Sequence, residues 1–179
     1  DGAGSFAVSE SGSVLFWGVG DLAERNLESL PKASGAGLNI NASSPTIVPE
    51  LEGATRVARG LFLGCALFAS GQVKCWGNNF SGQLGDGSNN DSSIPRSLAG
   101  LNDSVTRIAA GFDHTCYLRL QGEVRCWGGN FAGGLGDGTT TGRNTPSAAV
   151  AGLPDVIEIA AGLGYTCARL LLSGEVYCW

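Results

Sequence analysis

Apolar and polar residues alternate over short stretches of this chain, which is the period of a β-strand with one buried face. Cys116 and Leu118 fall on one face of a first stretch, and Val124 and Cys126 fall on one face of the next. The Gln121–Gly122 step between them predicts a tight hairpin, because glycine supplies the positive φ that a short bulged loop requires. The pattern therefore predicts two antiparallel strands joined by a short turn.

The same pattern recurs along the chain. The segment RIAAGFDHTCYLRLQGEVRCWGGNFAGGLGDGT matches RVARGLFLGCALFASGQVKCWGNNFSGQLGDGS at an offset of 51 residues. A further copy, EIAAGLGYTCARLLLSGEVYCW, runs into the C-terminus, and a degenerate copy, SFAVSESGSVLFWG, opens the chain. Each copy has one tryptophan at the same place: Trp17, Trp76, Trp127 and Trp179. We expect these rings to pack between repeats, with a ligand platform as the alternative.

Two further apolar segments complete each copy, such as 105–109 and 148–150. About four short antiparallel strands in about 51 residues are typical of one blade of a β-propeller. We therefore expect an all-β fold in which 1–179 is part of one propeller domain. The repeats fall at about 1–60, 61–111, 112–162 and 163–179, which makes three blades and the start of a fourth. Because an open arc leaves blade faces unpaired, we expect a longer parent chain or a ring completed by other chains.

Composition narrows the range of functions. Sixteen acidic and eleven basic residues give a net charge of −5, which argues against nucleic-acid binding, since such proteins carry a basic face. No stretch approaches the ~18 uninterrupted apolar residues of a membrane span. An apolar content of 43% with low net charge argues against intrinsic disorder.

The first copy contains an insertion with a helical pattern. Asp21 can cap a helix, with Glu24 three residues further on, and Pro31 ends the pattern. We expect a short helix of roughly ten residues that faces solvent. Because binding residues favour loops on a rigid scaffold, its charged residues Asp21, Glu24, Arg25 and Glu28 are candidates for partner contact. The alternative is a plug that covers a blade edge.

The six cysteines fall into three pairs: Cys65/Cys75, Cys116/Cys126 and Cys167/Cys178. On each hairpin the two partners face each other at a Cα separation of ~4.5–5.5 Å, which suits a disulfide. The degenerate copy has Phe6 and Phe16 at both positions, as expected for residues that act as a pair. The alternatives are free buried thiols and a zinc site, although this spacing gives only two ligands per blade. Disulfides favour a secreted or extracellular protein, or another oxidising compartment.

Four Asn-x-Ser sequons are possible N-glycosylation sites in a eukaryotic secreted protein: Asn41, Asn79, Asn90 and Asn102. Asn79 is the poorest acceptor of the four, because it lies inside the repeat motif beside Phe80.

A catalytic centre is hard to assemble from these residues. His114 is the only histidine, and Asp113 should point to the other face of its strand. We expect His114 to bond neighbouring backbone, with acid–base or metal chemistry as the alternative. In the loops around Asp86 and Asp137 an aspartate bonded to its own turn is favoured over calcium, which needs a set of spaced carboxylates. No nucleophile elbow, phosphate loop or HExxH motif is present. We therefore expect no enzyme activity, no cofactor and no metal.

The last hairpin is longer by one residue, since Cys167 and Cys178 are eleven apart and the other pairs ten. One extra residue turns every later side chain to the opposite face unless a β-bulge absorbs it. Regular pairing would set Arg169 opposite Val176 on a face that we expect to be buried, where an unpaired guanidinium is costly. We therefore predict an interrupted ladder within 168–173, with Arg169 directed to solvent or to an acidic partner.

The motif I-A-A-G-x-x-H-T-C followed by G-E-V-x-C-W-G-x-N-x-x-G-x-L-G-D-G-T resembles the repeat of the regulator of chromosome condensation family. The resemblance covers nearly the whole chain and implies a seven-bladed β-propeller, of which this chain would form a partial ring. It implies no single activity, because relatives include a nuclear guanine nucleotide exchange factor that docks on chromatin, secreted bacterial enzyme inhibitors and interaction modules.

We expect a disulfide-stapled, non-enzymatic module for extracellular protein interaction, adhesion or assembly, whose partners are proteins. One alternative is a guanine nucleotide exchange factor or chromatin-docking propeller. The other is a secreted carbohydrate-binding or enzyme-associated domain.

Overall fold

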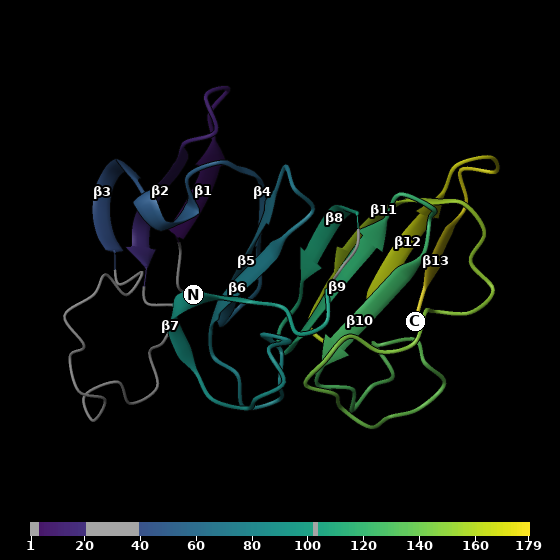
Figure 1. Cartoon of the computed structure of the whole chain (residues 1–179). Helices are drawn as coiled ribbons and strands as arrows, with labels where there is room; N and C mark the ends of the chain where they lie inside the picture. The colour runs from purple at the N-terminus through teal and green to yellow at the C-terminus, as the bar shows by residue number, and fades with distance from the viewer. Residues whose placement is uncertain (1–3, 21–39, 102–103) are drawn as a thin grey trace.

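Four antiparallel sheets stand side by side in chain order (Figure 1). The computed structural model describes residues 4–20, 40–101 and 104–179. The predicted helix with its four charged candidates, Asp21, Glu24, Arg25 and Glu28, lies outside the described residues, as does Asn102. The described part is an all-β partial propeller.

The strands are short and pair with their neighbours in sequence. The first sheet contains β1 (Gly4–Val8), β2 (Val14–Gly20) and β3 (Ile40–Ile47). After a 3₁₀ turn (Pro49–Leu51), the second contains β4 (Ala54–Arg59), β5 (Leu63–Phe68), β6 (Val73–Gly77) and β7 (Ser92–Ser97). The third contains β8 (Val105–Ala110), β9 (His114–Arg119) and β10 (Val124–Gly128), and the fourth contains β11 (Val156–Ala161), β12 (Thr166–Leu170) and β13 (Val176–Cys178). The second, third and fourth sheets thus begin one strand before the tryptophan-containing hairpin, whereas the first sheet begins with that hairpin.

The hairpin register is the predicted one. Cys65 lies opposite Cys75, and Leu67 lies opposite Val73 on the same face. The third sheet repeats this arrangement with its own cysteines and Leu118 opposite Val124. All three predicted disulfides are present within the hairpins, 65–75, 116–126 and 167–178, each with a Cα–Cα distance of 4.1 Å.

The outer edge of the third sheet differs from the prediction. The segment 148–150 is not a strand, and a single bridge between Gly128 and Arg143 takes the place that β7 has in the second sheet. Asn144 is instead bonded to the second sheet's loop: its Nδ2 donates to the Gly87 carbonyl, and its own carbonyl accepts the Gly87 N–H, both at 3.0 Å. The chain there bonds the preceding blade as well as β10, because the Ser147 and Val150 N–H groups donate to the Cys126 and Val124 carbonyls.

A shared backbone carbonyl joins each of the last two sheets to the one before it. The Gln83 carbonyl accepts the Thr115 hydroxyl and the Trp127 indole N–H, both at 2.9 Å. The arrangement recurs one repeat later, where Gly134 accepts from Thr166 at 2.8 Å and from Trp179 at 2.9 Å.

Glycine provides the space for these tryptophans. A Cβ on Gly85 would lie 2.5 Å from Trp127 Nε1, and one on Gly136 would lie 2.5 Å from Trp179 Nε1. Trp76 and Trp127 are fully buried, so the tryptophans pack between sheets as expected.

The apolar faces of the hairpins in the second and third sheets are buried against the next sheet. Leu67 and Val73 belong to one core cluster with Val105 and Tyr117 of the third sheet. Leu118 and Val124 are packed in the same way by residues of the fourth sheet: Val156, Ile159, Ala168 and Leu170. The core is therefore a series of sheet-to-sheet contacts.

The predicted bulge in the fourth sheet is wrong. Pairing continues without interruption from Cys167–Cys178 to Arg169–Val176, and the extra residue lies in the turn that the Leu170 N–H closes on the Glu175 carbonyl. Arg169 avoids a burial penalty because it is 47% exposed and pairs with Glu158 at 2.9 Å. The acidic partner was therefore predicted correctly, while the burial that required a bulge was not.

Replacing Thr115 by valine should destabilise the protein by about 1 kcal/mol, because a buried hydrogen bond to Gln83 is lost while the Trp127 N–H still satisfies that carbonyl. Urea unfolding measures the difference. The control, Thr140→Val, changes an exposed loop residue and should stay within about 0.5 kcal/mol of wild type. Equal effects of the two substitutions would mean that the shared carbonyl does not stabilise the contact between sheets.

Dithiothreitol should reduce the 167–178 disulfide before the other two. Cys178 is exposed, whereas the cysteines of the other pairs are fully buried, and thiol exchange requires access to a sulfur. Timed quenching with an alkylating reagent and peptide mass mapping gives the order. Earlier labelling of Cys65 or Cys116 would contradict the expected order.

Candidate functional site

Three glycine turns lie together at one end of the sheets, between the first and second strands of the second, third and fourth sheets. The Leu61 N–H donates to the Gly111 carbonyl at 3.2 Å, and the Phe112 N–H donates to the Gly162 carbonyl at 3.1 Å. A Cβ on Gly111 would clash with the Gly162 carbonyl and with the His114 ring. The repeated glycine thus allows the turns to approach and to bond across two sheet boundaries.

Apolar side chains on these turns, together with Phe131 from the loop after β10, form a surface that we call the turn face: Leu61, Phe62, Phe112, Phe131, Leu163 and Tyr165. Phe131, Leu163 and Tyr165 are 72%, 68% and 55% exposed. The Phe62 and Phe112 rings meet edge to face with centroids 5.4 Å apart, and the space beside Gly164 brings the Phe131 ring next to the fourth sheet's turn. An exposed aromatic surface on a rigid framework is suited to binding.

The turn face is hollowed. A depression of about 440 Å³ is lined by Leu61, Phe112, Leu163 and Tyr165 together with the glycine turns. Among the described residues that line it, Arg59 is the only charged one. Partial burial lowers the pKa of Arg59 from its ordinary value, but a guanidinium stays charged at physiological pH. The depression therefore combines apolar walls with one cation.

Two ordered loops stand beside the turn face. The Asn78 N–H donates to the Phe62 carbonyl at 2.8 Å, and the neighbouring Asn79 is fully buried. Its Nδ2 donates to the Ser88 and Asn90 carbonyls at 3.1 and 3.0 Å. Asn130 makes the equivalent contacts in the next repeat. These amides fix the loops that follow β6 and β10.

The sequons differ in their surroundings. Since the Asn79 amide nitrogen is buried and bonded, the structure argues against a glycan there, and Asn79 is withdrawn as a candidate. Asn90 is exposed and stays a prediction. Asn41 lies in β3, but its side chain is outside the described part of the structure. The whole of Asn102 lies outside the described residues.

The loop aspartates bond their own turns, as expected. Asp86 accepts the Ser88 N–H at 2.9 Å and its hydroxyl at 2.8 Å. Asp137 accepts the same bonds from Thr139 and pairs with Arg143 at 2.7 Å. Burial acts to raise the pKa of Asp137, but these contacts outweigh burial and lower the pKa to about 2.

His114 lies at the start of β9 and joins two sheets. Its Nε2 lies 3.0 Å from the hydroxyl of Thr166, whereas we expected a bond to nearby backbone alone. Since Thr166 donates to Gly134, the ring nitrogen is the donor to the hydroxyl oxygen. Burial lowers the pKa of His114, and a hydrogen bond with the backbone of Tyr165 opposes this.

Asp113 does not form a dyad with His114. The Asp113 carboxylate lies 4.0 Å from Nδ1 of His114, which is too long for a hydrogen bond. Burial raises the pKa of Asp113, opposed by a bond to its own backbone. Gly129 makes room for this carboxylate, because a Cβ there would overlap it.

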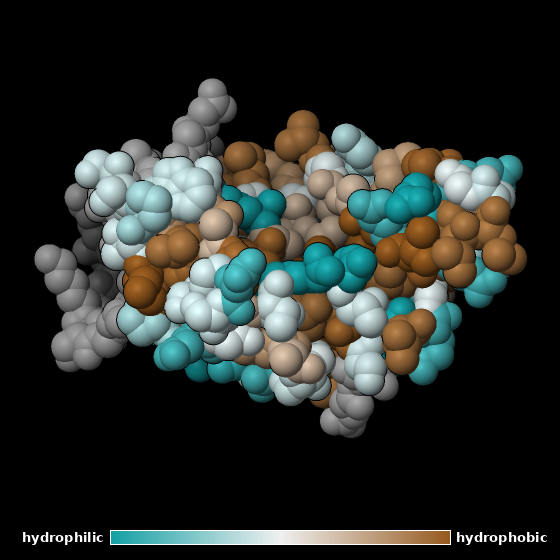
Figure 2. Space-filling view, turned by 90° about the horizontal axis from the view of Figure 1, so that it is seen from above, coloured by the Kyte–Doolittle hydropathy of each residue, from teal (hydrophilic) through white to brown (hydrophobic). Residues whose placement is uncertain are grey.

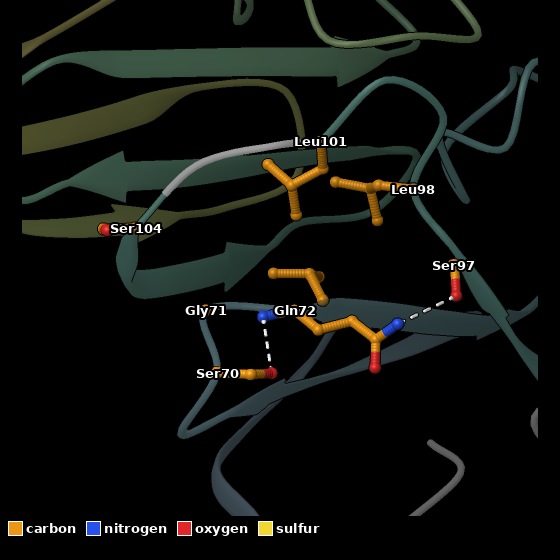
Figure 3. Close-up of a pocket in the computed structure, with 8 residues that line it drawn as sticks. Ser70, Gly71, Gln72, Ser97, Leu98, Leu101 and Ser104 are labelled. Carbon is orange, nitrogen blue, oxygen red and sulfur yellow. Dashed lines mark hydrogen bonds between the residues drawn. The ribbon is translucent and has the colours of Figure 1, made fainter.

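A second depression, of about 330 Å³, lies beside the β5–β6 hairpin (Figure 3). Leu98 and Leu101 lie on one side of it, and Ser70, Gly71 and Gln72 lie on the other. Gln72 already bonds Ser97 through its side chain and Ser70 through its backbone. Among the described residues its lining has no charged side chain, and its polar groups bond one another, so this depression is the weaker candidate.

Another apolar group lies at the end of the molecule formed by β12 and β13, at the right of Figure 2. Leu172 and Val176 are among the exposed hydrophobic residues of this segment. Val176 is equivalent to Val73 and Val124, which the next sheet buries. This surface is therefore the side of the fourth sheet that corresponds to the buried faces of the second and third sheets.

Within the described ranges, no three His, Cys, Asp or Glu side chains lie close enough together to hold a metal ion. In the same residues there is no helix of the length and apolar character needed to cross a membrane. The residues of the turn face were missed at the sequence level. The available signal was an apolar residue directly after each repeated glycine, at Leu61, Phe112 and Leu163, where a turn normally carries polar residues.

Comparison with known proteins identifies the repeats. Models of the regulator of chromosome condensation (RCC1) repeat match residues 70–118 and 105–133. The chain is 30% identical over 190 aligned residues to the human E3 ubiquitin-protein ligase HERC2, covering 100% of this chain and 4% of that protein. It is 29% identical to the ultraviolet-B receptor UVR8 of Arabidopsis thaliana, covering 96% of this chain and 38% of the receptor. The chain thus spans less than half the length of these relatives.

Solved structures show the same fold. Prp20p from Saccharomyces cerevisiae superimposes with a TM-score of 0.76 at 22% identity, covering 98% of this chain and 43% of that one. Human WBSCR16 gives a TM-score of 0.74 at 24% identity, covering 94% and 42%. At these identities the likeness concerns the fold.

Replacing His114 by leucine, the residue at the equivalent position 63 of the preceding repeat, should remove part of the pH dependence of stability. An unfolded histidine takes up a proton below about pH 6.5. The buried ring has a lowered pKa, so the folded protein takes up this proton only at lower pH. Wild-type stability should therefore fall by up to about 1.4 kcal/mol for each pH unit between those two values.

Thermal unfolding of both proteins between pH 7.5 and 5 tests this expectation. Asp113 is present in both and cancels in the difference. Parallel curves for wild type and H114L would contradict a buried neutral histidine.

Proposed function

Because the chain belongs to the regulator of chromosome condensation repeat family, we propose that it is a non-enzymatic protein-binding module that contacts its partner through the turn face. The observation that carries this proposal is the exposure of Leu61, Leu163 and Tyr165 around one depression. Aromatic residues are enriched in the centres of protein interfaces. Contiguous exposed apolar surface is uncommon on soluble proteins unless it serves binding.

The rigidity of the turn face supports this role. Its turns are bonded through Gly111 and Gly162, and its flanking loops are fixed by the buried amides of Asn79 and Asn130. A surface that is already ordered loses little conformational entropy when a partner binds. The partner therefore meets a preformed site.

We also place the module in an oxidising compartment, as a secreted or extracellular protein for interaction, adhesion or assembly. The three hairpin disulfides support this placement. The uncovered side of the fourth sheet supports completion of the ring by further blades, of a longer chain or of other chains, since the equivalent sides of the second and third sheets are covered.

The lining of the depression weighs against carbohydrate as the ligand. Apart from the Arg59 guanidinium and the Tyr165 hydroxyl it offers apolar side chains and glycine backbone, whereas a polar ligand needs several convergent polar groups. The solved structure of Prp20p was described together with its binding to Gsp1p and histones. We therefore retain the exchange-factor function as an alternative outcome of the test.

A photo-crosslinking residue placed at Leu163 should form a discrete protein adduct in extracts or culture medium of the source organism. Unlabelled wild-type chain should compete for this adduct, and the double variant L163S/Y165S should compete at least tenfold more weakly, because it loses two anchors. Crosslinking from Leu120, exposed on a hairpin at the other end of β9, is the control.

Adducts only from Leu120, or adducts for which wild type and L163S/Y165S compete equally, would overturn the assignment of the turn face. Release of nucleotide from a small GTPase would favour the exchange-factor alternative. Binding to a glycan array would favour the carbohydrate one.

A further inference from the structure

We propose that the partner places an apolar side chain in the depression of the turn face and a neighbouring carboxylate on Arg59. This inference rests on the proposed function and adds the chemistry of the bound segment. It identifies the occupant as a segment of the partner protein in which an aromatic or aliphatic residue lies next to a carboxylate, either of an acidic residue or of the partner's own C-terminus.

The apolar side chain of the proposed ligand is inferred from the walls of the depression. Leu61, Phe112, Leu163 and Tyr165 come from three successive turns and converge on one depression. The glycines Gly60, Gly111 and Gly162 also contribute to the lining. An inserted side chain would therefore contact apolar atoms on several sides, as an interface anchor does.

The carboxylate of the proposed ligand is inferred from the position of Arg59. It is the last residue of β4, directly before the Gly60 turn, and it is the only charged residue in the lining that the described part of the chain provides. The lowered pKa of Arg59 reflects partial loss of water around the cation. An ion pair gains strength where water is excluded.

A guanidinium has five N–H donors in a planar fork that matches a carboxylate. Arg59 can therefore accommodate a ligand carboxylate in addition to the contacts that it makes within the chain. Among the described residues no acidic side chain lines the depression, so none of them repels an incoming anion. A basic ligand would instead meet a like charge.

The same strand provides a matched control. Arg56 is on β4, three residues before Arg59, and is exposed. It is not among the residues that line the depression. Replacing either arginine by methionine removes one charge and keeps the aliphatic stem, so only R59M should alter recognition at the turn face.

The test uses two small probes of the same shape, N-acetyl-phenylalanine, which carries a carboxylate, and its neutral amide. Each is titrated into the ¹⁵N-labelled chain, and the amide signals of Leu61, Phe112 and Leu163 are followed by NMR. We expect both probes to shift these signals, with the carboxylate bound at least threefold more tightly in 50 mM NaCl. The preference should shrink at 500 mM NaCl, since salt screens charge.

In R59M the preference for the carboxylate should disappear while the amide still binds, and in R56M the preference should persist. The spectrum itself reports whether each variant is folded. If R59M is not folded, the ratio of the two affinities in the wild-type chain and its salt dependence decide the question.

Equal affinity of the two probes, tighter binding of the amide, or shifts confined to residues outside the turn face would each overturn the inference. Crosslinking from Leu163 is an independent measurement. A protein adduct at Leu163 combined with no carboxylate preference would leave the protein-binding function intact and remove only the role assigned to Arg59.

Discussion

A backbone carbonyl in one sheet, shared by a threonine hydroxyl and a tryptophan N–H of the next, is the contact on which the arrangement of the sheets depends. Gln83 and Gly134 provide this carbonyl one repeat apart. The carbonyl can accept twice because it has two lone pairs. The tryptophan can reach it only because glycine, at Gly85 and Gly136, leaves space for the indole ring. The contact joins the second sheet to the third and the third sheet to the fourth.

The turn face is formed where the joined sheets meet. When neighbouring sheets are joined in this way, their first turns come close enough for Leu61 to bond Gly111 and for Phe112 to bond Gly162. The residues after the glycines then point outward as a group instead of packing into the core. Apolar side chains that would be unremarkable on separate hairpins become one hollowed surface, and the cation of Arg59 lies at its edge. Binding capacity thus arises from the repetition of a short turn.

The fourth sheet shows how far a repeat can be extrapolated. Its hairpin keeps the register of the others, but Arg169 occupies the place of Leu67 and Leu118. The expectation of a bulge assumed that this place is always buried. In the structure its partner is Glu158 on β11, and both side chains are exposed. An assumption about burial, not about strand pairing, produced the error. The expectation that His114 would bond nearby backbone also depended on local sequence alone. Its partner Thr166 belongs to another sheet.

What the sequence by itself determined is local. Alternation of apolar residues, a glycine at each turn and cysteines at opposed positions fix the hairpins, their register and their disulfides, because all of these depend on residues within about one hairpin of each other. The repeat extends that result to the whole chain and predicts the propeller class. Only the tertiary structure decided which faces are covered, why 148–150 is not a strand, and that Leu61, Phe112 and Leu163 meet. Those outcomes depend on contacts between residues about 51 positions apart, and whether a side chain is buried is set by the sheet packed against it.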